Sequence, residues 1–226
     1  MTGTGSLRRR ARTATVSLMT VELVTTDGIF ALDGGEWDVT NNIWILGDDR
    51  DVVVVDAAHD HGPIVEAVNG RRVKAIMLTH GHNDHINAAV PLREALDAPI
   101  WLHEADRMLW DVVWPGDRPD RAIEAGETVT VGEHTLRVLH TPGHSPGCCC
   151  FHDERDGTVF SGDTLFCGGP GATGRSHSDE PTILRSIRDT LLALPGETIV
   201  HTGHGESTTI AAERAGVLAR AAELDA

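Results

Sequence analysis

Four side chains of the kinds that bind metal ions lie within six residues, directly after an apolar run. The run, residues 73–78, is typical of a buried strand, and loops at strand ends are held rigidly while staying accessible. Residues two apart in extended backbone share a face, so His80 and His82 can reach one ion, while Asp84 and His85 point to a neighbouring position. A loop of surface histidines is the alternative, but this density of ligands is hard to obtain by chance. The pattern therefore predicts a metal site in the segment Thr79-His80-Gly81-His82-Asn83-Asp84-His85.

Three later turns each place one more such side chain after a predicted strand. His144 stands in a stiff Thr-Pro-Gly-His turn, Asp163 in a Ser-Gly-Asp-Thr turn, and His204 in a Thr-Gly-His-Gly turn. Each turn alone is a weak indication, because a lone Pro-Gly-His or Gly-Asp is usually only a turn. Together, in this order and each at a strand end, they predict the ligands that complete two coordination spheres.

The predicted elements change character along the chain. Strands are expected first at residues 18–24, 42–46, 52–55, 73–78 and 100–102, with helices at 63–68, 84–96 and 104–110. Hairpins follow, 128–131 with 135–139 and 148–152 with 158–160, and then a helix at 180–192, a strand at 198–200 and a helix at 208–224. Pro91 predicts a kink or a late start in the second helix. This order suits two packed sheets flanked by helices, an α+β fold with a four-layer αβ/βα sandwich.

Composition limits the domain organisation and the partners. No segment rich in Pro, Gly or Ser divides the chain, so one domain is expected over residues 19–226, after a flexible tail at 1–18. The tail lacks the apolar stretch of a signal peptide, and no run approaches the ~18 apolar residues of a membrane helix. The net charge of −15 argues against a nucleic-acid partner. A soluble, cytoplasmic protein without a membrane partner is expected, and the oligomeric state is left open.

The four cysteines favour packing over metal binding. Cys148, Cys149 and Cys150 are consecutive, so their side chains alternate between the two faces of a strand, and Cys167 stands apart. The chain has no Cys-x-x-Cys pair and no paired disulfide framework, which fits a reduced compartment.

The four metal-site motifs resemble those of the metallo-β-lactamase superfamily over nearly all of residues 20–210. The stretch Phe160-Ser161-Gly162-Asp163-Thr164-Leu165-Phe166 and the later Gly203-His204-Gly205 are similar to the glyoxalase II (hydroxyacyl-thiol hydrolase) branch. The resemblance implies the metallo-β-lactamase fold and two metal positions bridged by Asp163. The first would be held by His80, His82 and His144, and the second by Asp84, His85 and His204.

The resemblance implies hydrolysis with two divalent ions, for which Zn²⁺ is expected and Fe or Mn are the alternatives. Two cations about 3.5–4 Å apart lower the pKa of a shared water, and the resulting hydroxide attacks a carbonyl. The site has no obvious general acid, which suits a thiolate leaving group because free thiols titrate near ~8.5. A small-molecule thioester is the predicted substrate. Asp84 is the candidate catalytic residue, since it can orient the attacking hydroxide, although a ligand role alone is the simpler interpretation.

The carrier thiol is predicted from where the chain departs from the family. Similar enzymes that use glutathione rely on Tyr and Lys side chains and on an added C-terminal helical region. This chain contains no Tyr and its last residue is Ala226. A composition rich in Ala, Arg and Gly but poor in Lys is typical of high-GC genomes, in which thiols such as mycothiol serve. Hydrolysis of acyl- or formyl-mycothiol is the resulting hypothesis.

Four other functions compete with thioester hydrolysis. A mononuclear-iron persulfide dioxygenase resembles this scaffold and would use His80, His144 and Asp163 as a facial triad with open positions. The bridging aspartate and the cytoplasmic expectation argue against β-lactam hydrolysis, and the net charge argues against cleavage of nucleic acid. A metal-stabilised scaffold without catalysis would turn over no ester or thioester.

Several residues outside the motifs carry open interpretations. Asp56 resembles the family's acid that orients the ligand loop, and a simple strand-end cap is equally consistent. Arg175 can meet an anionic substrate tail, although a solvated surface arginine is the simpler interpretation. Residues 169–174 match G-x-G-x-x-G but open no helix in a βαβ unit, so a loop at the site rim is expected. His59 and His61 are expected near the site mouth.

Overall fold

Two six-stranded sheets form the centre of the molecule. The computed structural model describes residues 20–224, so the predicted tail at 1–18 lies outside the described residues. The first sheet has the order β1 (Thr20–Leu32), β2 (Gly35–Gly47), β3 (Asp51–Val55), β4 (Arg72–Met77), β5 (Ile100–Leu102) and β6 (Arg121–Ala122). The second has the order β14 (Thr208–Thr209), β13 (Ile199–Thr202), β10 (Thr158–Gly162), β9 (Cys149–Asp153), β8 (His134–His140) and β7 (Thr128–Val131). A short ribbon pairs β11 (Leu165–Phe166) with β12 (Gly169–Pro170).

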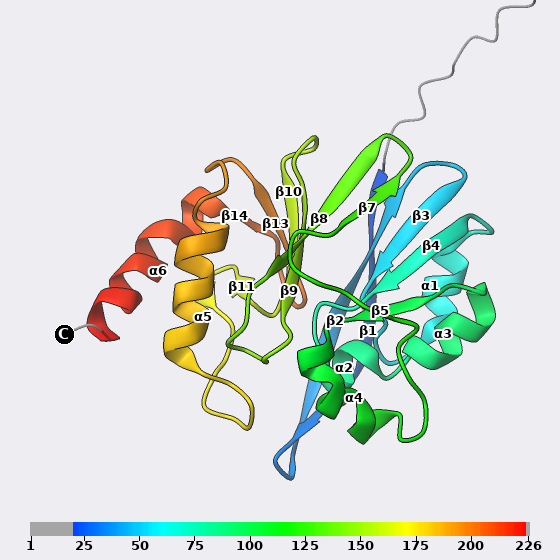
Figure 1. Ribbon diagram of the computed structural model, residues 1–226, viewed down its shortest axis with the longest axis horizontal. Coiled ribbons are helices and arrows are strands. Elements are labelled where there is room, and N and C mark those ends of the chain that lie inside the picture. Colours follow the sequence, from blue (N-terminus) through cyan, green and yellow to red (C-terminus); the bar gives the residue numbers. More distant parts are fainter. Residues whose placement is uncertain (1–19, 225–226) are drawn as a thin grey trace, which may run out of the picture.

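Helices cover the outer face of each sheet and complete four layers (Figure 1). The first sheet is covered by α1 (His61–Val68), α2 (Asn83–Ile86), α3 (Ala89–Leu96) and α4 (Arg107–Val113), and the second by α5 (Glu180–Ser186) and α6 (Ile210–Leu224). None of the helices within residues 20–224 is long and apolar enough to cross a membrane. The predicted α+β sandwich is confirmed.

Successive side chains of a strand point to opposite faces of its sheet, which explains how the layers pack together. Val52 and Val54 of β3 pack with the helices of the first sheet, while Val53 and Val55 pack between the two sheets. In β9, Cys149 lies between the sheets and Cys150 faces α5 and α6. A run that is apolar on both faces can be buried only in the middle of such a sandwich. The predicted packing role of the consecutive cysteines agrees with these positions.

Most predicted elements are present, and the differences are at their ends. The helix predicted over 84–96 is divided into α2 and α3, and α3 begins at Ala89, so that Pro91 lies in its first turn, where no backbone donor is needed. A 3₁₀ turn at Glu104–Asp106 precedes α4, and a π-helical turn at Ile187–Leu191 follows α5. Residues 208–209 pair with β13 instead of opening the last helix.

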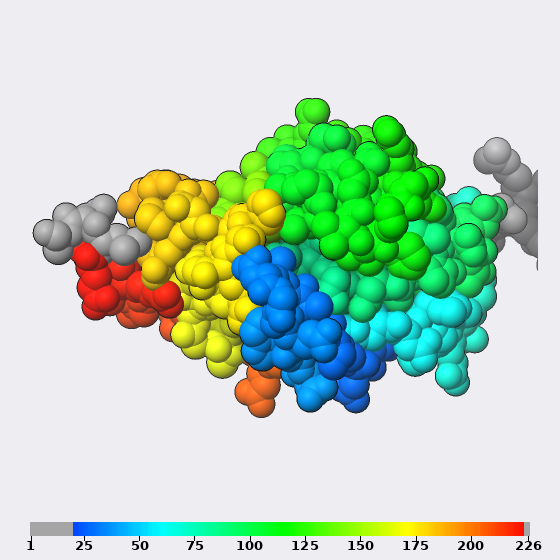
Figure 2. Space-filling model, turned by 90° about the horizontal axis from the view of Figure 1, so that it is seen from below, coloured from blue at the N-terminus to red at the C-terminus, as the bar shows by residue number. Residues whose placement is uncertain are grey.

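The largest difference is a long hairpin at the start of the described chain. Within the described residues, the strands predicted at 18–24 and 42–46 fall in β1 and β2, which are 13 residues each and pair along their whole length. Asp33 and Gly34 form the turn, with φ of 53° and 77°. An Asp-Gly pair suits this turn because both central residues need positive φ. The hairpin reaches beyond the sheet and brings its tip against residues 171–178 (Figure 2).

Candidate metal centre

Three buried histidine rings, from the loop after β4 and the turn after β8, face one another. His80 Nε2 lies 3.0 Å from His82 Nδ1, and His82 Nδ1 lies 3.0 Å from His144 Nε2. The other nitrogens of two rings are engaged elsewhere. His80 Nδ1 lies 3.1 Å from Thr79 Oγ1, and His144 Nδ1 donates to the Ala172 carbonyl at 2.8 Å. The Nε2 lone pairs of His80 and His144 therefore point into a common space with His82 Nδ1.

Asp84, His85 and His204 form a second group beside the first. His85 Nε2 lies 3.2 Å from His204 Nε2, and Asp84 Oδ2 lies 3.3 Å from His204 Nε2 and 3.6 Å from His85 Nε2. His204 Nδ1 donates to the Thr40 carbonyl at 2.7 Å, and His85 Nδ1 donates to Asp56 Oδ2 at 2.9 Å. These bonds turn the Nε2 atom of each ring toward the group.

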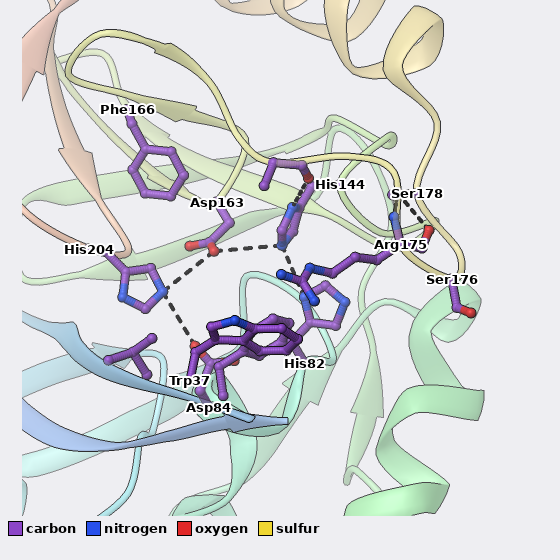
Figure 3. Close-up of a pocket in the computed structure, with 13 residues that line it drawn as sticks. Trp37, His82, Asp84, His144, Asp163, Phe166, Arg175, Ser176, Ser178 and His204 are labelled. Carbon is purple, nitrogen blue, oxygen red and sulfur yellow. Dashed lines mark hydrogen bonds and ion pairs between the residues drawn. The ribbon is translucent and has the colours of Figure 1, made fainter. Parts of the chain in front are cut away.

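Asp163 lies between the two groups (Figure 3). Its Oδ2 is 3.6 Å from His144 Nε2 and 3.5 Å from His204 Nε2, while its Oδ1 is 3.3 Å from His85 Nε2. Gly162 at the end of β10 makes this position accessible: its φ is 49°, and a Cβ there would lie 2.4 Å from Thr79 Oγ1. Only glycine fits such a turn at this close approach.

The donors present fit a pair of divalent cations. The three ligand atoms of His80, His82 and His144 lie within 4.8 Å of one another, and so do those of Asp84, His85 and His204. Among the described residues, Asp84 Oδ1 and Asp163 Oδ1 are buried without a hydrogen-bond partner. Buried carboxylate oxygens of this kind are costly unless a cation meets them. The structure thus brings all seven sequence-predicted residues together.

The two ligand groups differ in the protonation of their histidines. Burial lowers the pKa of His80 well below its ordinary value and that of His82 to about 3, so both rings are neutral at pH 7. Burial also opposes charge on His85 and His204, but the nearby carboxylates, Asp163 first, outweigh it. They raise the pKa of His204 to about 10 and that of His85 well above its ordinary value. A cation that binds the second group takes the place of these protons.

The carboxylate of Asp56 fixes the ligand loop through hydrogen bonds to Thr79 and His85. It has a left-handed backbone, with φ of 65°, and its Oδ1 accepts from the Thr79 amide at 2.7 Å. Thr79 Oγ1 donates to the same carboxylate, and Asp56 Oδ2 accepts from His85 Nδ1 at 2.9 Å. A simple strand-end cap would not reach a site histidine, so the orienting interpretation of Asp56 is the one that these contacts favour.

Asp106 joins the two ligand loops, and sequence reasoning missed it. Its Oδ2 accepts from the Gly81 amide at 2.8 Å and from Ser145 Oγ at 2.6 Å, and its Oδ1 accepts from the Gly147 amide at 2.6 Å. Gly81 stands between His80 and His82, and Ser145 follows His144. One fully buried carboxylate therefore fixes both segments that carry the first histidine group.

A cavity of about 270 Å³ opens over the two groups. Phe30 and Trp37 of the hairpin line it, together with Phe166 and Arg175. The Arg175 guanidinium carbon lies 3.7 Å from the Trp37 ring centre and 5.5 Å from that of Phe30. Arg175 is thus on the cavity wall, where an anionic group can meet it. The sequence alone did not identify these aromatic residues as part of the site. The Asp-Gly pair at the tip is the sequence feature that predicts the hairpin carrying Phe30 and Trp37.

The loop at 169–174 lies at the rim, as predicted. Ala172 lines the cavity and accepts from His144, and Asp33 Oδ2 at the hairpin tip accepts from the Ser176 amide at 2.9 Å. The loop and the hairpin therefore close one side of the cavity together.

A separate group of ligand-type side chains, His134, Asp153 and Asp156, lies elsewhere, in and after strands of the second sheet. His134 Nδ1 lies 2.6 Å from Asp153 Oδ2, and Asp153 Oδ1 accepts from the Arg155 amide at 3.0 Å. A buried hydrogen bond between His134 and Asp153 accounts for these contacts, and we assign no ion to this group.

The chain is similar in sequence to known proteins. A family model described as the metallo-beta-lactamase superfamily matches residues 37–204. The hydroxyacylglutathione hydrolase GloC of Haemophilus influenzae is 31% identical over 185 residues, which cover 75% of this chain and 87% of that protein.

Two solved structures are similar over most of the chain. TTHA1623 in a di-iron-bound form is 34% identical with a TM-score of 0.70, and the match covers 78% of this chain and 93% of that one. The BLEG-1 B3 metallo-beta-lactamase is 30% identical with a TM-score of 0.70, and the match covers 83% and 95% of the two chains.

Proposed function

Because the chain belongs to the metallo-beta-lactamase superfamily and is a metal-dependent hydrolase, we propose that it cleaves a thioester of a low-molecular-weight thiol with two divalent ions. The observation that carries the proposal is Asp163, whose carboxylate lies between two complete ligand groups at the floor of the cavity. The relative named hydroxyacylglutathione hydrolase supports the thioester class.

The ligand assignment follows the two groups. His80, His82 and His144 would hold one ion, Asp84, His85 and His204 the other, and Asp163 would bridge them. Zn²⁺ is the proposed ion, with Fe and Mn as alternatives, since the donors are imidazole and carboxylate. When bound, such a pair of ions lowers the pKa of a shared water and polarises the carbonyl that is attacked.

The chain's own residues define what the site accepts. Phe30, Trp37 and Phe166 give the cavity an apolar wall that suits the acyl chain and excludes water. Arg175 supplies a cation beside that wall and suits a carboxylate or phosphate on the substrate. Asp84 has its Oδ1 free of any hydrogen-bond partner among the described residues, which supports a role in orienting the attacking hydroxide in addition to binding an ion.

A thiolate leaving group suits this arrangement. It needs little protonation near neutral pH, and burial keeps the site's neutral histidines His80 and His82 from acting as acids. For the carrier thiol, our first candidate is mycothiol, ahead of glutathione. The proposed substrate is therefore an acyl- or formyl-thioester of mycothiol.

The test is metal analysis combined with a substrate panel. We expect about two metal ions per chain and turnover of small thioesters without O₂ uptake. Faster turnover of the mycothiol thioester than of the glutathione thioester supports the carrier, and equal rates contradict it. Failure of the metal-loaded protein to hydrolyse any thioester overturns the proposal.

A persulfide dioxygenase with a single iron is the second candidate. Its facial triad would be His80, His144 and Asp163, of which His144 Nε2 lies 3.6 Å from Asp163 Oδ2. The similar structure in a di-iron-bound form supports iron as a metal for this scaffold. One iron per chain with O₂ consumption on a persulfide would establish this alternative.

A further inference from the structure

A chain of hydrogen bonds leads from outside the site to the second ligand group. His59 Nε2 lies 2.9 Å from Asn41 Oδ1, and Asn41 Nδ2 lies 3.1 Å from Asp84 Oδ2. On its other side, His59 Nδ1 lies 3.1 Å from Asn87 Nδ2. Asn41 is on β2, His59 follows β3 and Asn87 follows α2, so three separate segments are joined in one chain of hydrogen bonds that ends at Asp84.

The direction of every bond follows from a single backbone donor. The His59 amide donates to Asn87 Oδ1 at 2.6 Å, which identifies that atom as the amide oxygen. Asn87 Nδ2 must then donate to His59 Nδ1, so the neutral ring carries its proton on Nε2. His59 Nε2 in turn donates to Asn41 Oδ1, which leaves the Asn41 N–H groups directed at Asp84.

The surroundings of His59 show that its position is built into the fold. Its backbone has φ of 56°, a left-handed conformation that is uncommon outside glycine. Its ring occupies the space beside Gly28 of β1, where a Cβ would lie 2.1 Å from Nδ1. Burial lowers the pKa of His59, which keeps the ring neutral and limits it to one N–H.

Asn41 itself is fully buried against the second ligand group. Its Nδ2 lies 3.2 Å from His85 Nε2 and 3.5 Å from His204 Nε2, in addition to its bond to Asp84. An amide nitrogen has no free lone pair for a cation, so Asn41 in this orientation acts on the ligands and not as one of them.

We propose that Asn41 is a positioning residue of the metal centre, oriented by His59 and Asn87 so that its amide fixes the carboxylate of Asp84. The metal part of this inference rests on the proposed two-metal function. Asn41 sets the affinity of the Asp84–His85–His204 group for its ion and leaves the His80–His82–His144 group unaffected. Residues that orient a metal ligand in this way typically change affinity by about 10–100-fold when they are removed.

The first experiment is independent of metal and of catalysis. Two-bond ¹H–¹⁵N correlation spectra of the metal-free protein distinguish the two tautomers of each histidine. The relay requires His59 to carry its proton on Nε2. A proton on Nδ1 would reverse the donor direction and overturn the proposal, whatever the enzyme's reaction.

The second experiment is metal titration of Asn41→Leu, which keeps the number and branching of the side-chain heavy atoms and removes both polar ones. We expect the second equivalent of metal to bind about 10–100-fold more weakly and the first to bind as in the parent. Cobalt spectra recorded during the titration report which group is filled. Unchanged binding of the second ion, or equal weakening of both ions, overturns the proposal.

Matched variants separate the relay from general destabilisation. His59→Phe breaks the relay without touching Asn41 and should reproduce the effect, even if Asn41→Leu fails to fold. His61→Phe, two residues along at the start of α1, should bind both ions as the parent does. A parent protein that binds one ion contradicts the two-metal function, and the His59 tautomer then still tests the relay.

Discussion

Arg175 is the only residue on the cavity wall, among those described, that carries a permanent positive charge. Replacing it with Gln should raise KM by about tenfold or more for a thioester with a carboxylate or phosphate, because a charge-assisted hydrogen bond contributes about 1.5–3 kcal/mol. The kcat should stay the same, since the contact is remote from the reacting carbonyl. Steady-state kinetics on a charged and a neutral thioester measure this. Arg185→Gln on α5 is the control, and equal losses on both substrates would contradict the prediction.

The residues of the site differ in how visible they are in the sequence. The seven proposed ligands could be predicted because each follows a strand in a short turn and is a ligand type by itself. Asn41, Asp106 and His59 could not, because their roles come from partners 18 or more positions away that only the sheet topology brings near. An Asn within a strand and an Asp in a helix start have many other uses, so their residue type alone indicates nothing.

At the scale of elements, Asp106 ties the loop after β4 to the turn after β8. Asp106→Asn replaces one carboxylate oxygen with an N–H donor, so a buried Gly81 amide, Gly147 amide or Ser145 hydroxyl loses its acceptor. The free energy of unfolding should fall by about 1–3 kcal/mol. Affinity for the ion of the His80–His82–His144 group should fall too. Urea denaturation of the metal-free protein and metal titration measure these effects, with exposed Asp111→Asn on α4 as the control. Unchanged stability would show that the loops are fixed otherwise.

The hairpin and the 171–178 loop should act as one unit on the substrate. The Arg175 guanidinium stacks on Trp37, a contact worth about 0.5–1 kcal/mol at a partly exposed site. Trp37→Ala and Arg175→Gln should therefore each lower kcat/KM for an anionic thioester. The double variant should lose about 0.5–1 kcal/mol less than the sum of the two single losses. Strictly additive losses would mean that the two residues contact the substrate independently.

The elements show why one part of the fold escaped prediction. The strands β3 and β9 are apolar on both faces and are bounded by turns, so their place in the middle of the sandwich can be read from the sequence. Residues 27–40 are exposed or half-buried, because the hairpin projects beyond the sheet. Their one apolar run, residues 29–32, is short and borders the turn, so the Asp33-Gly34 pair is the clearest indication of the hairpin in the sequence.

For the whole molecule, the metal centre lies between the two halves of the sandwich. His80, His82, Asp84 and His85 follow a strand of the first sheet, whereas His144, Asp163 and His204 follow strands of the second. Ions held by both sets join the halves, so metal binding should stabilise the fold as a unit. At a metal concentration about 1,000 times Kd, one ion adds about 4.1 kcal/mol to the free energy of unfolding. A shift of the single denaturation transition to higher urea tests this, and a shift in only part of the transition would contradict it.

The stability of the metal-free protein should depend on pH in a way that metal removes. The pKa of His204 is raised from 6.5 to about 10, so its contribution is fully present below pH 6.5 and is lost as pH rises toward 10. The pKa of His82 is lowered from 6.5 to about 3, so the unfolded chain takes up the proton first and stability falls as pH drops below 6.5. The metal-free protein should therefore be most stable near pH 6.5.

A bound ion replaces the proton of His204, so the decline toward pH 10 should disappear in the loaded protein. Denaturation curves of both forms between pH 5 and 10 measure this, and a metal-free protein that gains stability above pH 7 would contradict the protonation assigned to the second ligand group.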